Sequence, residues 1–241
     1  MKKRTYIDLS HVIEDGVITH KGLPAPIICD YLSREESKKL YEPGTEFQIG
    51  KIEMVTNTGT YIDVPFHRYK DGADLAQTAI DKTAGLEGIV ISIDPTLTAI
   101  DESHFQHVDV KGKAVLLHTG WDRYWNTDDY LENHPYLTER AAAYLVSQQP
   151  ALVGIDSMNI DDTKGKARPA HTLLLGAGIV IAEHLCRLDQ LTESFLFYAV
   201  PPKIKGAGTF PVRAFAEIER TSSNYIDTGK CRNLKTKSSR F

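Results

Sequence analysis

The chain has 241 residues, of which 41% are hydrophobic and 25% are charged, and its formal net charge at pH 7 is −4. These proportions are ordinary for a soluble globular protein and allow one domain with a large core. Because the charge balance is weakly acidic and the longest apolar run (173–182) is too short for a bilayer, we expect neither a nucleic acid nor a membrane as a partner.

Two further features predict a cytoplasmic location. The basic start of the chain is not followed by an apolar segment, because Asp8 and Glu14 are among the polar residues that interrupt it, so no signal peptide is expected. Cys29, Cys186 and Cys231 show no paired spacing. An odd, sparse set of cysteines favours reduced thiols over a disulfide framework.

In chain order, short apolar runs predict strands at 5–12, 52–56, 88–93, 114–118, 151–155, 179–182 and 195–200. Several of these runs are continuously apolar, which is typical of strands buried on both faces. Thr138, followed by an alanine-rich segment, predicts a capped helix. Strands interleaved with helices favour the α/β class, and without repeats or a linker the sequence predicts one domain over 1–241.

Two charged segments have no motif. Residues 32–46 predict a solvated helix or loop, and the alternative is a mobile flap over the functional site. Residues 228–241 contain five Lys or Arg residues and no aromatic residue except the terminal Phe241, which predicts a flexible basic tail.

The segment from Asn57 to His67 concentrates polar side chains at regular spacing. If it is extended, Asn57, Tyr61 and Asp63 point the same way, and Gly59 leaves room on that face for a substrate or an ion. Pro65 then ends the strand because it has no N–H to donate. The functional interpretation is a hydrolytic site, and the alternative is a buried polar strand edge.

The same segment resembles the signature of the cyclase family, which includes bacterial kynurenine formamidases and isatin hydrolases. That signature reads His-x-Gly-Thr-His-x-Asp-x-Pro-x-His. Gly59, Thr60, Asp63, Pro65 and His67 match it. A second block from His171 to Glu183 is similar to the later His…Glu block of the family. Further similar motifs run in family order from residue 8 to about residue 216.

This resemblance implies a mixed β-sheet or barrel-like core flanked by helices. It also implies an arylformamidase-like hydrolase of a small amide, formamide or cyclic amide or ester. Asp63, His171 and Glu183 would hold a divalent ion that activates water, and His67 would be the catalytic acid/base, since histidine titrates near neutral pH. A small-molecule substrate and a homodimer or homotetramer are implied as partners.

Asn57 and Tyr61 depart from the family pattern, because they stand where the signature has its first two histidines. Two imidazoles favour zinc, whereas amide and phenol oxygens favour a harder ion such as manganese. We therefore expect manganese or zinc as the cofactor. Because the ordinary pKa of tyrosine is about 10, we expect Tyr61 to hydrogen-bond a ligand or substrate and not to coordinate as phenolate. The alternative function is a metal-free protein that binds a small ligand on the same scaffold.

Other residues have simpler interpretations. Trp121 could contact substrate in an aromatic pocket, although a core position is the more common use of tryptophan. His184 follows Glu183, so in an extended segment it would point to the opposite face. His134 lies in polar loop sequence, which predicts a surface position.

Overall fold

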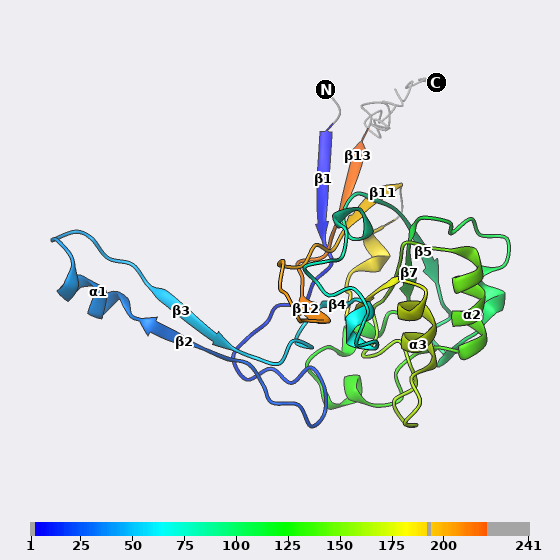
Figure 1. The fold of residues 1–241 in the computed structure, drawn as a ribbon, viewed down its shortest axis with the longest axis horizontal. Coiled ribbons are helices and arrows are strands. Elements are labelled where there is room, and N and C mark those ends of the chain that lie inside the picture. Colours follow the sequence, from blue (N-terminus) through cyan, green and yellow to red (C-terminus); the bar gives the residue numbers. More distant parts are fainter. Residues whose placement is uncertain (1–2, 192–193, 221–241) are drawn as a thin grey trace, which may run out of the picture.

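The computed structural model describes residues 3–191 and 194–220 (Figure 1). A mixed nine-stranded sheet forms the centre. Its spatial order is β1 (Lys3–Asp8), β13 (Phe215–Arg220), β11 (Phe195–Tyr198), β5 (Leu86–Ser92), β7 (Ala114–His118), β9 (Leu152–Ile155), β10 (Val180–Glu183), β4 (Tyr61–Asp63) and β12 (Thr209–Pro211). The pairs between β5, β7, β9 and β10 are parallel, and the flanking pairs are antiparallel. The predicted α/β fold with a mixed sheet is confirmed.

Smaller elements complete the described part of the chain. Two further sheets pair β2 (Ile27–Leu32) with β3 (Ile49–Glu53) and β6 (Ala99–Ile100) with β8 (Tyr136–Leu137). The α-helices are α1 (Arg34–Leu40), α2 (Glu139–Gln148) and α3 (Pro169–Gly176). Short 3-10 turns are η1 (Pro65–His67), η2 (Ile80–Lys82), η3 (Glu102–Phe105), η4 (Trp121–Tyr124), η5 (Asp128–Leu131) and η6 (Leu188–Gln190).

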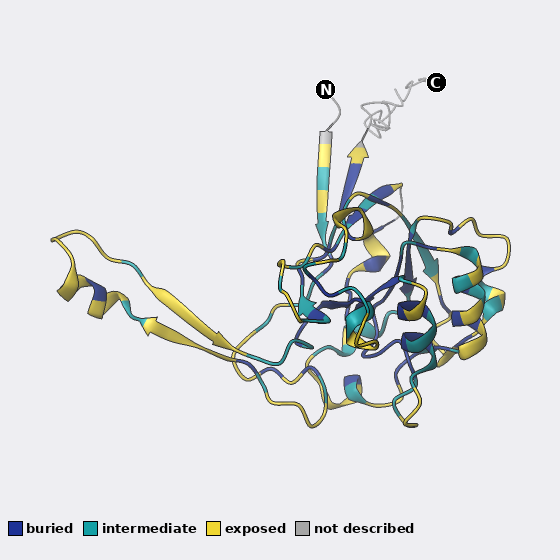
Figure 2. Ribbon diagram, in the orientation of Figure 1, coloured by how far each residue is buried: buried dark blue, intermediate teal, exposed yellow. Residues whose placement is uncertain are grey.

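The central strands are buried on both faces, as their continuous apolar sequence predicts. In β7, Ala114 and Leu116 belong to one core cluster, whereas Val115 and Leu117 belong to the other. Helices α2 and α3 cover the face that carries the second cluster, where Leu145 packs. Figure 2 shows the central strands as mostly buried or intermediate, whereas the strands of a projecting arm are mostly exposed.

Local signals predict helix α2 and strand β7 well. Strand β7 spans the predicted residues 114–118, and the Thr138 side chain accepts a hydrogen bond from Ala141 N as the N-cap of α2. The motif strand is shorter than predicted, because Gly59 has a φ of +65° and only Tyr61–Asp63 are extended. A Cβ at Gly59 would lie 2.6 Å from Ile13 Cγ1, so this glycine faces Ile13, and the expectation that it makes room for an ion is wrong.

Strands β2 and β3, with α1 at the tip, form an arm that projects from the body (Figure 1). Helix α1 is a solvated helix with a capping box between Ser33 and Glu36. It lies at the far end of the arm, away from β4 and α3, and does not cover them. The charged stretch 32–46 therefore forms the outer part of this arm, beyond most of β2 and all of β3.

The remaining expectations from the sequence concern the cysteines, a membrane span and the basic tail. Cys29 is exposed and Cys186 is buried, and both are free. Among the described residues, no helix combines the length and the apolar character needed to cross a membrane. The predicted basic tail 228–241 and Cys231 lie outside the described residues.

Candidate metal centre

Strand register brings two carboxylates to one face of the sheet. Strand β4 pairs antiparallel with β10, so that Tyr61 lies opposite Glu183 and Asp63 lies opposite Ile181. Directly opposed residues share a face, and Ile181 belongs to the core cluster beneath α3. Tyr61, Asp63 and Glu183 therefore all point toward α3, whereas Ile62 points into the opposite core.

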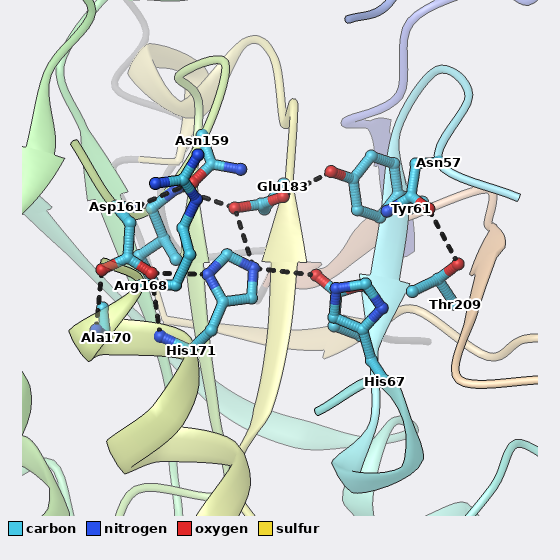
Figure 3. A network of polar contacts seen from close by, with 12 residues as sticks. Asn57, Tyr61, His67, Asn159, Asp161, Arg168, Ala170, His171, Glu183 and Thr209 are labelled. Atoms are coloured by element: carbon cyan, nitrogen blue, oxygen red, sulfur yellow. Dashed lines mark hydrogen bonds and ion pairs between the residues drawn. The ribbon is translucent and has the colours of Figure 1, made fainter. Parts of the chain in front are cut away.

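Helix α3 supplies the imidazole of the site. The N-cap residue Arg168 makes no side-chain cap, and the Asp161 carboxylate instead accepts hydrogen bonds from Ala170 N (2.7 Å) and His171 N (3.0 Å). Asp161 Oδ2 also lies 2.6 Å from His171 Nδ1. This contact orients the ring, leaving His171 Nε2 3.5 Å from Asp63 Oδ2 and 3.7 Å from Glu183 Oε1 (Figure 3).

The electrostatics of this cluster favour positive charge. Asp63 and Glu183 are fully buried, and neither oxygen of Asp63 has a hydrogen-bond partner in the described part of the chain. Burial raises the pKa of Glu183 to about 7, and the charge of Asp63 adds to this rise. Burial lowers the pKa of His171, but the charge of Glu183 and the contact with Asp161 outweigh it and raise the pKa to about 10.

This donor set fits a divalent ion. One ligand atom from each of Asp63, His171 and Glu183 lies within 4.8 Å of the others. A buried carboxylate without hydrogen-bond partners is costly unless a cation compensates its charge. The contact of His171 Nδ1 with Asp161 is the arrangement that usually orients metal-binding histidines.

Tyr61 makes a hydrogen bond to a carboxylate of this cluster. Tyr61 Oη donates to Glu183 Oε2 at 2.5 Å, and His20 Nε2 lies 2.9 Å from the same Oη. Burial and the charges of Glu183 and Asp63 raise the Tyr61 pKa well above 10, so Tyr61 is a neutral phenol. Asn57 Oδ1 accepts a hydrogen bond from Thr209 Oγ1 at 3.2 Å.

A cavity of about 480 Å³ opens beside the cluster, and Asn57, Tyr61, His67 and His171 line it. This volume is within the usual range for small-molecule sites. His67 follows Pro65 in η1, and its side chain is 37% exposed. His67 Nδ1 lies 3.9 Å from Asp63 Oδ1, which is too far for a hydrogen bond. A Cβ at residue 208 would lie 2.4 Å from His67 N, so glycine at this position lets the two backbone segments pack closely.

The other walls of the cavity carry positive charge. Arg68, Lys166 and Arg168 line it, and within the described residues none of its lining residues is acidic. Arg68 Nε donates to Thr172 Oγ1, and Arg168 donates to backbone carbonyls. No ion pair of the described chain involves these three cations.

Some sequence interpretations differ from the structure. Trp121 does not line this cavity, and its Nε1 donates to Tyr130 O. His134 is 4% exposed and contacts Ser157 and Thr163, so its predicted surface position is wrong. His184 does not point to the face opposite Glu183, because its φ of 56° ends the extended strand and turns the ring back.

Sequence reasoning missed His20 and Asp161 as site residues. His20 lies in a loop without a motif and reaches the site only through the tertiary fold. Asp161 offered a weak signal, since it is a carboxylate ten residues before a suspected ligand histidine.

The protein is of the α/β class, with a mixed sheet that carries a buried carboxylate–imidazole cluster beside an open cavity. Residues 7–162 match the family model described as "Putative cyclase". The chain is 33% identical over 168 residues to the kynurenine formamidase of Geobacillus thermodenitrificans (strain NG80-2), which covers 69% of this chain and 78% of that protein. It is 27% identical over 217 residues to the kynurenine formamidase of Bacillus cereus (strain ATCC 14579), covering 89% of this chain and 98% of that protein.

Solved structures agree with this assignment. A structure described as a potential metal-dependent hydrolase with cyclase activity is similar with a TM-score of 0.73 and 25% identity, covering 89% of this chain and 98% of that chain. Isatin hydrolase A from Labrenzia aggregata has the same fold, with a TM-score of 0.77 at 22% identity over 90% of this chain and 94% of that chain. The chain belongs to the cyclase family.

Proposed function

We propose that this protein is a metal-dependent hydrolase of a small amide, arylformamidase-like, with formamides as the preferred class and cyclic amides or esters as related substrates. The observation that carries the proposal is the buried cluster of Asp63, His171 and Glu183, which lies beside a cavity that His67 lines. The kynurenine formamidases that resemble this chain support the choice of a C–N bond outside a peptide.

The cofactor of this proposal is a divalent ion, manganese or zinc, held by Asp63, His171 and Glu183. When bound, such an ion supplies Lewis acidity toward a carbonyl group and toward water. Asp161 orients His171, and Ile160 N donates to Glu183 Oε1 at 2.7 Å, so both side chains are fixed in advance. Fixed ligands preserve the geometry on which catalysis depends.

His67 moves the proton in the proposed reaction. Its imidazole takes a proton from water as the new C–O bond forms, and gives it to nitrogen as the C–N bond breaks. His67 suits this role because it lines the cavity, is partly exposed, and is not held in a hydrogen bond to Asp63.

The cationic walls of the cavity indicate a substrate with an anionic group. Arg68 and Lys166 are exposed at the cavity and have no carboxylate partner in the described chain. A substrate carboxylate would complement these charges. We therefore propose an aryl formamide that carries a carboxylate as the substrate class.

The test compares metal content with hydrolysis. Purified protein is analysed for metals, depleted with a chelator, and reloaded with manganese or zinc, while formate release is measured from an aryl formamide that carries a carboxylate. We expect about one or more equivalents of metal and activity that returns on reloading. Purified protein that contains no metal, binds the compound and gains no activity on addition of manganese or zinc would instead support the ligand-binding alternative.

The arm is the basis of a proposed homodimer or homotetramer. Its apolar side chains Ile27, Tyr31 and Ile52 are 54%, 76% and 59% exposed. An isolated two-stranded ribbon is marginally stable in water, so contact with another copy of the chain would stabilise it. Light scattering should give a mass above the monomer that falls in Ile52→Asp and not in Lys51→Asp. A monomeric wild-type protein would contradict this assembly.

A further inference from the structure

Glu183 has potential metal ligands on two sides. On one side, Oε1 faces His171 Nε2 at 3.7 Å, within the cluster that includes Asp63. On the other side, His20 and His184 each place a ring nitrogen within 4.8 Å of a Glu183 oxygen and of each other. The second group consists of two imidazoles and one carboxylate, and the proposed function does not use its histidines.

His184 is held so that one ring nitrogen is available. The residue is fully buried, and its positive φ turns the side chain away from the direction that strand β10 would give it. His184 Nδ1 lies 2.8 Å from Tyr130 Oη, whereas Nε2 is buried and has no hydrogen-bond partner in the described part of the chain. An unpaired buried ring nitrogen is costly in a folded protein and needs an explanation.

The two histidines that flank Glu183 share a pattern. His171 is anchored at Nδ1 by Asp161, and His184 is anchored at Nδ1 by Tyr130. Each ring then has Nε2 left for a contact within its group. Metal-binding histidines usually have one nitrogen on the ion and the other fixed by a neighbouring group.

His20 closes the second group from the loop that precedes β2. Its ring packs edge-to-face against His184 with centroids 5.1 Å apart. His20 Nε2 also lies 2.9 Å from Tyr61 Oη, which donates to Glu183 Oε2. Tyr61 therefore lies at the edge of this group, and an ion bound there would replace these two hydrogen bonds with coordination.

We infer that His20, Glu183 and His184 form a second divalent-cation site that prefers zinc and shares Glu183 with the first site. Two histidines and a glutamate are a ligand set of three-residue zinc sites, which keep a further position open. Imidazole-rich sites favour zinc, whereas the carboxylate-rich first site suits manganese as well. Because Tyr61 competes for Glu183 and His20, the second site should bind zinc more weakly than the first.

The inference rests on the proposed function, since it assumes that the first site also binds metal. Chelator-treated protein is titrated with zinc against a chromophoric competitor, and the visible absorption of bound cobalt is recorded in parallel. We expect two equivalents in the wild-type protein. His20→Gln should retain one tight equivalent and lose the weaker one together with its cobalt absorption, and His184→Gln should do the same. His104→Gln, a histidine remote from the site that contacts Asp101, is the control and should bind two.

The outcomes separate the two proposals. A wild-type protein that binds one equivalent, unchanged in His20→Gln, would overturn the second site and leave the first intact. Binding of no zinc at all would overturn the second site, and binding of neither zinc nor manganese would contradict the proposed metal-dependent function itself. If His184→Gln does not fold because its ring is fully buried, His20→Gln decides the question, since His20 is only partly buried and lies in a loop.

Discussion

The role of Asp161 can be tested by a substitution that keeps its size. Asp161 is fully buried and accepts hydrogen bonds from Ala170 N and His171 N, while its Oδ2 also lies against His171 Nδ1. In Asp161→Asn only one oxygen remains as an acceptor, and the new amide N–H₂ group faces N–H donors. The imidazole of His171 then loses the contact that fixes its orientation.

Two magnitudes follow from these contacts. Loss of a group that orients a ligand histidine typically weakens metal binding by about 10- to 100-fold. A buried N–H left without an acceptor costs roughly 1–3 kcal/mol of folding free energy. For a chain of this size, each kcal/mol lowers the melting temperature by roughly 2–4 °C. We therefore expect a weaker metal site in a protein that is destabilised but folded.

The assay is a competition titration with zinc or manganese, run beside thermal unfolding followed by circular dichroism. Asp162→Asn is the matched control, because Asp162 is adjacent in sequence and, within residues 3–191 and 194–220, its carboxylate accepts only from Lys164 N, at 2.9 Å. This control should bind metal as the wild-type protein does. If folded Asp161→Asn keeps wild-type metal affinity within about two-fold, well short of the loss typical for such a group, the orientation of His171 by Asp161 does not matter for metal binding and our reasoning fails.

Three further predictions concern the cavity and its surroundings. His67→Ala should lower kcat for formamide hydrolysis by roughly a hundred- to ten-thousand-fold with metal content unchanged; loss of metal as well would make His67 a ligand. Lys166→Ala should raise KM about two- to five-fold for a substrate with a carboxylate and not for its neutral analogue, as expected for an exposed charge pair; equal effects on both substrates would exclude charge recognition. His11 stacks on Trp125 with ring centroids 4.0 Å apart, and burial lowers its pKa to about 4. Unfolding therefore takes up a proton between pH 6.5 and 4, and stability falls as the pH is lowered through that range. Denaturation of His11→Gln should therefore show a smaller loss, by up to about 1.4 kcal/mol per pH unit, and an identical pH dependence would refute the assignment.

The parts of the fold that the sequence predicts are those fixed by local chemistry. The strand at 114–118 is a continuous apolar run, and the helix after Thr138 has both a cap and helix-favouring alanines. The prediction for the segment around Gly59 is wrong because Gly59 has a left-handed backbone and lies close against Ile13. Alternation in a sequence predicts direction only while the chain stays extended.

The site residues also divide into those that the sequence indicates and those that only the tertiary fold brings to the site. The resemblance of the two motif blocks to the cyclase-family signature indicates Asp63, His171 and Glu183 as candidate ligands from the sequence alone. His20 could not be found like this, because its contact with Tyr61 joins residues 41 positions apart through a loop without regular periodicity. The orientation of His184 depends on a single positive φ at the end of β10, which no hydrophobic pattern encodes.

Tyr61 stands at the position of a signature histidine but has a different role. The pairing of β4 with β10 places residue 61 opposite Glu183, and this register depends on the backbone and not on the side chain at 61. An imidazole at this position could offer a lone pair to an ion. The phenol of Tyr61 is neutral, so its hydroxyl donates a hydrogen bond to the Glu183 carboxylate, and its oxygen lies 2.9 Å from His20 Nε2. The substitution thus converts a potential metal ligand into a group that holds Glu183 in place. Any imidazole that binds metal on this side of Glu183 must then come from elsewhere in the chain, and the structure places His20 and His184 there.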